Sequence, residues 1–220
     1  MKNFFLAIVF CLLTVPPVHG RVLVDQIGRT VEFAEPLTRV VSLAPNLTEI
    51  SYEVGGGDTL VGATRFANFP EAAAGLPKVG SYVALDIEKI VSLKPQLCLA
   101  IRDGNPKAAV DRLEALGIPV YVFDPQSLEA IVDTVERLGA LYRQEARAAA
   151  LADGYRQRLA RVARQVAGVT NRPEVFFQMR RPVVDPPEHC REAAQIFTLM
   201  ADKLGMIPDI PDDVQAAAEQ

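Results

Sequence analysis

The chain has 220 residues, of which 50% are hydrophobic and 23% are charged, and its formal net charge is −4 at pH 7. This length provides one sizeable hydrophobic core, or one domain with an appendage. The acidic balance argues against nucleic acid as the main partner, because a chain that binds phosphates usually carries a basic excess.

Residues 1–20 have the parts of a secretory signal peptide. Lys2 gives a positive start, residues 4–15 are almost wholly apolar, and residues 18–20 offer a cleavage site. The apolar run is too short for a comfortable membrane span, and the bulky residue before Cys11 argues against a lipid anchor. We therefore expect cleavage after Gly20 and export of the mature chain to an oxidising compartment.

Two cysteines, Cys98 and Cys190, remain after this cleavage. An oxidising compartment allows a disulfide between them. However, Cys98 lies in a short apolar run that is typical of a buried strand, which favours a buried free thiol.

The first predicted elements are two short β runs, residues 22–25 and 30–33, around a turn that contains Gly28. Two such runs around a glycine turn predict a β-hairpin.

A buried strand is predicted over residues 39–43, and Pro45 ends it because proline cannot donate to a ladder. A helix then begins at once, with Asn46 as the predicted N-cap and Glu49 at the spacing of a capping box. Amides at such a helix start lie beyond the carboxyl end of a strand, where open α/β sheets bind ligands. An ordinary capped βα unit has the same pattern.

Strands and helices continue to alternate up to residue 125. Further strands are predicted over residues 95–100 and 118–123, with helices over residues 87–92 and 107–116. Asp86 is the predicted cap of the first helix, and Asn105 is the predicted cap of the second, with Pro106 at its first position. This alternation predicts an α/β fold with a parallel, doubly wound sheet.

Residues 127–168 have apolar side chains at helical spacing. They predict one long helix, or two successive helices with a break near Gly139 or Gly154. Such a helix either packs on the sheet or acts as a strut between two units. A strand is expected over residues 173–178 and a helix over residues 188–204.

Three stretches together resemble a known family. Residues 39–49, the loop 66–70 and the run 86–96 look like the helical-backbone periplasmic binding proteins of ABC importers, and most like the sub-group that binds vitamin B12. Relatives bind haem and iron–siderophore chelates. The family has two α/β lobes joined by a long helix, with the ligand between the lobes. The resemblance implies a ligand-binding lobe over residues 21–125, a connecting helix over 126–169, and a truncated or atypical segment over 170–220.

The resemblance also implies the ligand-binding residues. Phe66, Phe69 and Tyr82 match positions where the B12 binders carry aromatic residues, and a flat macrocycle needs flat apolar walls. Arg102 and Asp103 are expected to add polar contacts to side groups of the ligand. The alternative is that the three aromatic residues belong to the core.

Glu88 matches an exposed glutamate that pairs with arginines of the membrane permease in this family. The resemblance therefore implies a docking contact that weakens with salt. A solvated position on a helix face is the alternative for this residue.

The C-terminal part departs from the family pattern. A second lobe is expected after Phe177, but only about forty residues follow it. The chain is therefore either truncated or frameshifted, or it is a single-lobe variant.

The expected function is the periplasmic substrate-binding component of an ABC transporter for cobalamin or a related corrinoid. The alternatives are a haem or iron–siderophore binding protein of the same family, or a non-functional truncated fragment. An enzyme is disfavoured because the sequence has no Ser/His/Asp set, metal-ligand cluster or phosphate loop with a lysine. His189 is either an axial ligand to a macrocycle metal or a solvated histidine. No resident cofactor is expected, and the oligomeric state is left open.

Overall fold

The computed structural model describes residues 20–170. Residues 1–19 of the predicted signal peptide, the strand over residues 173–178, the helix over 188–204, His189 and Cys190 lie outside the described residues. The chain divides into two compact units at Val162 and Ala163. The first unit contains the whole sheet, and the description below concerns that unit.

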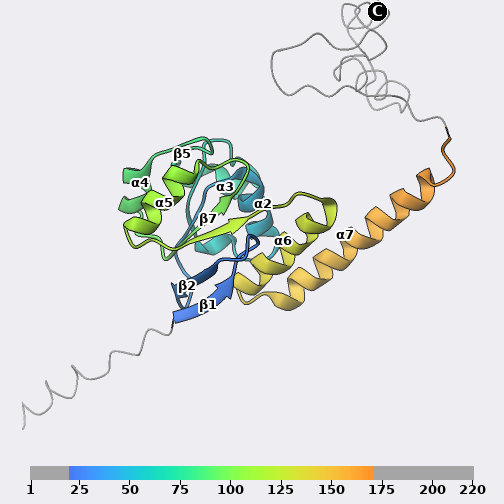
Figure 1. Ribbon diagram of the computed structural model, residues 1–220, viewed down its shortest axis with the longest axis horizontal. Coiled ribbons are helices and arrows are strands. Elements are labelled where there is room, and N and C mark those ends of the chain that lie inside the picture. The colour runs from blue at the N-terminus through green and yellow to red at the C-terminus, as the bar shows by residue number, and fades with distance from the viewer. Residues whose placement is uncertain (1–19, 171–220) are drawn as a thin grey trace, which may run out of the picture. The chain divides into compact units, whose positions relative to one another are not determined.

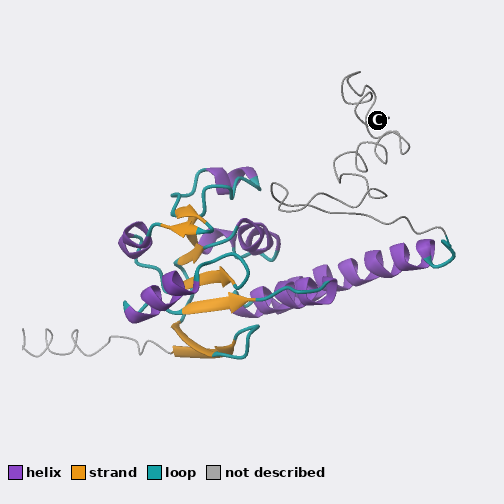
Figure 2. Cartoon of the chain, turned by 45° about the horizontal axis from the view of Figure 1, so that its top comes forward, coloured by secondary structure: helices purple, strands orange, loops and turns teal. Residues whose placement is uncertain are grey.

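The described chain contains a sheet with helices on both of its faces (Figures 1 and 2). The strands are β1 Gly20–Val24, β2 Thr30–Ala34, β3 Val40–Ser42, β4 Leu60–Ala63, β5 Gly80–Ser81, β6 Ala84–Leu85, β7 Leu97–Ile101 and β8 Val120–Phe123. The helices are α2 Pro45–Glu53, the 3₁₀ turn η1 Gly57–Thr59, α3 Glu71–Ala74, α4 Ile87–Ser92, α5 Lys107–Ala115, α6 Leu128–Leu141 and α7 Glu145–Val166.

The central sheet has four strands in the order β4-β3-β7-β8, and every neighbouring pair is parallel. This confirms the predicted α/β fold with a parallel sheet. Strands β1 and β2 form the predicted antiparallel hairpin. Strands β5 and β6 form a second, two-residue hairpin that the sequence did not indicate.

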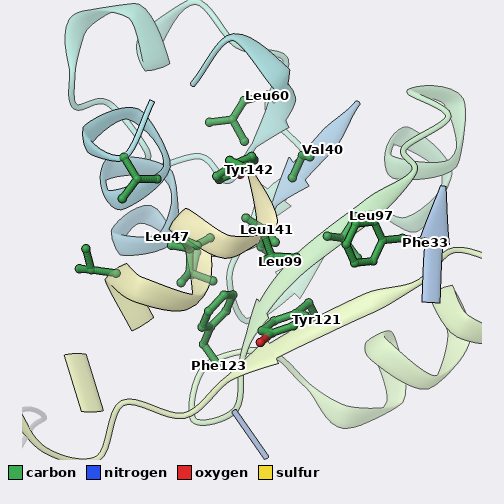
Figure 3. Packing of buried hydrophobic residues seen from close by; sticks show 14 of the residues in the cluster. Phe33, Val40, Leu47, Leu60, Leu97, Leu99, Tyr121, Phe123, Leu141 and Tyr142 are labelled. Carbon is green, nitrogen blue, oxygen red and sulfur yellow. The ribbon is translucent and has the colours of Figure 1, made fainter. Parts of the chain in front are cut away.

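The hydrophobic core occupies both faces of the central sheet. Leu97, Leu99, Tyr121 and Phe123 pack against α2, α6 and α7 (Figure 3). On the other face, Cys98 and its neighbours in alternate positions pack against α4 and α5. Successive strand residues point to opposite faces, so a strand that is covered on both sides is apolar throughout. Cys98 is a buried free thiol, and burial raises its pKa to about 12.

Two predicted helix caps are wrong. Helix α2 begins at Pro45 with Ala44 as its N-cap, and no side chain caps it, so Asn46 and Glu49 do not form a capping box. Proline is well suited to the first helical position because its missing N–H has no helical partner there. Pro106, rather than Asn105, is the N-cap of α5.

The predicted cap of α4 is confirmed, and α6 has a cap that the sequence analysis did not name. Helix α4 spans the predicted residues, and the Asp86 carboxylate accepts a hydrogen bond from the Lys89 amide at 2.9 Å. Ser127 caps α6 through the Ala130 amide at 3.1 Å. Asp and Ser are preferred at this position because their side chains satisfy amides that have no helical partner.

The predicted long helix is two helices, which was the alternative expectation. Helix α6 ends at Leu141, and α7 begins at Glu145 after a turn in which Arg143 has φ 58°. A Cβ at Gly139 would lie 2.1 Å from the Cβ of Ala148, so glycine is needed for this close helix approach. Within residues 20–170, no helix is long and apolar enough to cross a membrane.

Candidate functional site

The direction in which successive strands are added to the sheet reverses between β3 and β7. From β3 the chain moves outward to β4, and from β7 it moves outward in the other direction to β8. In open α/β sheets, ligands bind beyond the carboxyl ends of the strands at such a switch point. The loops after β3, β4, β7 and β8 therefore form the candidate site, which we call the carboxyl edge.

Asn105 holds this edge together. Its side-chain amide nitrogen donates to the Leu43 carbonyl at 2.9 Å and to the Tyr82 carbonyl at 2.8 Å, and its oxygen accepts from the Ile101 amide at 2.8 Å. One buried side chain thus joins the loop after β3, the β5–β6 hairpin and the loop after β7.

The three predicted aromatic side chains are exposed and do not belong to the core. The exposed fractions are 60% for Phe66, 65% for Phe69 and 41% for Tyr82. Phe66 and Phe69 lie on the loop after β4, and Tyr82 lies between β5 and β6. Phe66 and Phe69 thus lie three positions apart on one loop, and exposed apolar side chains that lie together are typical of an interaction site.

Hydrogen bonds hold the loop that carries Phe66 and Phe69, which we call the aromatic loop. The Lys78 ammonium donates to the Ala67 carbonyl at 2.7 Å and to the Ala73 carbonyl at 2.9 Å. Burial of this group lowers its pKa. The Arg65 amide also donates to the Gly80 carbonyl at 2.7 Å, so the loop is bound to the start of the β5–β6 hairpin.

Tyr82 packs against the loop after β7. A Cβ at Gly104 would lie 2.9 Å from the Cδ2 of Tyr82 and 2.9 Å from the Cγ2 of Ile101. The absence of a side chain at position 104 therefore allows the tyrosine ring to lie against the backbone. Val83, next to Tyr82, is also exposed and extends this apolar surface.

Four polar residues on the loops after β7 and β8 are joined by hydrogen bonds. The Arg102 guanidinium pairs with the Asp124 carboxylate at 2.8 Å, and the Gln126 amide donates to Asp124 at 2.7 Å and to Asp103 at 2.6 Å. Hydrogen bonds from Gln126, and then those from Arg102 with its charge, hold the pKa of Asp124 below its ordinary value. We call these four residues the polar cluster.

The model of the family described as "Periplasmic binding protein" matches residues 40–182. The chain belongs to the periplasmic binding protein family. Vitamin B12-binding proteins are among its curated relatives. That of Photorhabdus laumondii is 38% identical over 146 residues, which cover 66% of this chain and 52% of the relative. That of Yersinia pestis is 38% identical over 124 residues, which cover 56% of this chain and 44% of the relative. The chain thus spans about half the length of these relatives.

Solved structures of the family are similar as well. The periplasmic vitamin B12 binding protein BtuF of Vibrio cholerae is 35% identical with a TM-score of 0.61, over 66% of this chain and 56% of that chain. A periplasmic haem-binding protein from Pseudomonas aeruginosa is 30% identical with a TM-score of 0.59, over 64% of this chain and 52% of that one.

The structure places the other predicted site residues of this periplasmic binding protein on its surface. Arg102 and Asp103 lie together in the polar cluster, and Glu88 is exposed in the first turn of α4. Sequence reasoning missed Val83 and Gln126 and assigned Asn105 a capping role. The contacts of Asn105 and Gln126 join loops that are distant in the sequence, so no local pattern indicated them.

Proposed function

We propose that this chain is the substrate-binding component of an ABC importer for cobalamin or a related corrinoid. The exposure of Phe66, Phe69 and Tyr82 on the loops of the carboxyl edge is the observation that carries this proposal. A buried aromatic side chain contributes roughly 150–250 Å² of contact area. Three such rings provide an apolar surface that suits a large planar ligand.

The names of the relatives support the same ligand. The vitamin B12-binding proteins reach 38% and 35% identity, against 30% for the haem-binding protein of Pseudomonas aeruginosa. Haem binding is the second candidate because proteins named for haem share the fold. Either ligand requires binding and release without catalysis, and the family supports export of the mature chain to the periplasm.

A titration of the full mature chain with cyanocobalamin and with haem tests the proposal. We expect saturable binding of cyanocobalamin by calorimetry, and affinity losses of about tenfold or more for Phe66→Ala and for Tyr82→Ala, because each ring loses its apolar contact with the ligand. Leu116→Ala removes an exposed apolar side chain at the end of α5 and serves as the matched control.

Each variant is first checked for an unchanged circular dichroism spectrum and melting temperature. Tighter binding of haem than of cyanocobalamin would favour the second candidate. If neither ligand binds at high micromolar concentration, the chain is not a receptor, as expected of a non-functional truncated fragment.

We also propose that Glu88 contacts the permease. Its carboxylate is exposed on α4, and an exposed charge acts mainly on the association rate at low salt. Glu88→Gln should weaken capture of the chain by permease in nanodiscs, with the largest difference at low ionic strength. Equal capture of both forms at low salt would assign Glu88 to an ordinary solvated helix face.

A further inference from the structure

The polar cluster adjoins the aromatic surface of the carboxyl edge. Asp103 precedes Gly104, and the ring of Tyr82 lies against Gly104. The Asn105 side chain binds the same loop to the Tyr82 carbonyl at 2.8 Å. Arg102 and Asp103 therefore lie in the loop against which the Tyr82 ring packs, next to the surface on which the proposed macrocycle would stack.

Hydrogen bonds of Gln26 hold the polar cluster in place. The Gln26 side-chain oxygen accepts a hydrogen bond from the Asp124 amide at 2.7 Å, and the Gln26 amide nitrogen donates to the Ala130 carbonyl and to Asp133, both at 2.9 Å. The β1–β2 hairpin and α6 thus fix the position of Asp124. A site fixed in this way loses little conformational entropy when a ligand binds.

The charges of the cluster are unequal. It contains one guanidinium and two carboxylates, and Asp124 already pairs with Arg102. Within the described residues, Asp103 forms no ion pair and receives one hydrogen bond, from Gln126. An incoming carboxylate would compete with Asp124 for Arg102 and would be repelled by Asp103.

A carboxamide fits the same groups without this penalty. Its N–H can donate to the second oxygen of Asp103, and its carbonyl can accept from an Arg102 N–H that does not bind Asp124. The Arg102 side chain is 63% exposed, so these donors are open to a ligand. Hydrogen bonds to charged groups are about twice as strong as those between neutral groups.

We propose that the polar cluster selects macrocycles whose rim carries carboxamides over those whose rim carries carboxylates. This inference rests on the proposed function and deepens it, because corrinoids carry carboxamide side chains whereas haem carries two propionates. The cluster would then exclude the competing ligand class, rather than only strengthen binding of the preferred one.

Cyanocobalamin and its separated monocarboxylic acids, each with one corrin carboxamide hydrolysed, are the probes. Titrated into the full mature chain at low salt, at least one acid should bind about tenfold more weakly than cyanocobalamin, as for the loss of one charge-assisted hydrogen bond. Asp103→Asn, which keeps the shape of the side chain, should reduce this ratio to about threefold or less. Glu145→Gln removes an equal charge from an exposed position at the start of α7 and should leave the ratio unchanged.

Two results would overturn the inference while the proposed function stands. All of the acids would bind as tightly as cyanocobalamin, or the ratio would be the same in wild type and Asp103→Asn. Failure of cyanocobalamin itself to bind would overturn the proposed function, and the inference with it.

Discussion

Aromatic side chains occupy two contrasting regions of this molecule. Tyr121 and Phe123 lie within β8, are almost fully buried, and pack with their ring centroids 4.9 Å apart. Phe66 and Phe69 lie on the loop just beyond β4 and are largely exposed. Both regions carry phenylalanine, so position relative to the end of a strand decides whether a ring is buried in the core or remains exposed.

The same contrast holds for polar groups. In the core, the Tyr121 hydroxyl donates to the Val24 carbonyl at 2.8 Å, and the Tyr142 hydroxyl lies 2.9 Å from that of Ser51. At the carboxyl edge, Arg102 keeps donors open to solvent. Buried polar groups need hydrogen-bond partners within the protein, whereas a binding surface needs donors and acceptors that the protein itself does not use.

Phe123→Ala should give the largest effect on stability. Its ring is fully buried, and such a truncation costs about 3–5 kcal/mol of unfolding free energy through lost burial and the cavity left behind. Phe66→Ala should change the same quantity by less than about 0.5 kcal/mol. Urea denaturation followed by circular dichroism measures both, and similar losses for the two variants would contradict the contrast between the regions.

Asn105→Ala should have the next largest effect, because it leaves the Ile101 amide and the Leu43 carbonyl without the hydrogen bonds that they now form. Buried polar groups without partners cost about 1–3 kcal/mol each. We expect a lower urea midpoint and faster hydrogen exchange at the Ile101 amide. Asn68→Ala, at an exposed asparagine of the aromatic loop, is the control and should leave both unchanged.

Tyr142→Phe should cost about 1 kcal/mol, the typical value for one neutral hydrogen bond. The Ser51 hydroxyl keeps its bond to the Leu47 carbonyl at 2.7 Å, which limits the loss. Tyr82→Phe is the matched change at the carboxyl edge and should leave the melting temperature unaltered. An equal drop in both variants would show that the Tyr82 hydroxyl has a structural partner.

Glu35→Gln should have the smallest effect on stability, and this effect should depend on pH. Hydrogen bonds from Arg143, followed by the charges of Arg143 and Arg21, lower the pKa of Glu35 from its ordinary value of 4.5. Its contribution to stability is therefore present above pH 4.5 and is lost as the pH falls through the lowered value. Glu35→Gln should destabilise the chain slightly at pH 7 and not at all in strong acid, as urea midpoints across this range would show. A difference that does not change with pH would contradict the ion pair as its source.

Much of the fold was predictable because the buried strands are covered on both faces and are therefore continuous apolar runs, as in residues 97–100 and 120–123. Helix caps were predicted less well, since the N-cap of α2 is Ala44, two residues before the expected Asn46, and Pro45 takes the first helical position. The β5–β6 hairpin was missed because each of its strands has two residues and no alternation.

The exposed positions of the aromatic residues were expected from the resemblance to a family, because composition alone does not separate a loop phenylalanine from a core one. Asn105 could not be assigned correctly from the sequence. Its bond to the Leu43 carbonyl spans 62 positions, and such a contact exists only once the parallel sheet has brought β3 and β7 together.

The burial of Cys98 has a consequence for its reactivity. Its thiol is fully enclosed between β7 and the helices α4 and α5, and its raised pKa keeps it protonated under ordinary conditions. A thiol reagent can reach it only when the sheet opens, since the thiolate is the reactive form. The rate of Cys98 labelling would therefore report how often the native protein opens. A ligand bound at the carboxyl edge should lower that rate.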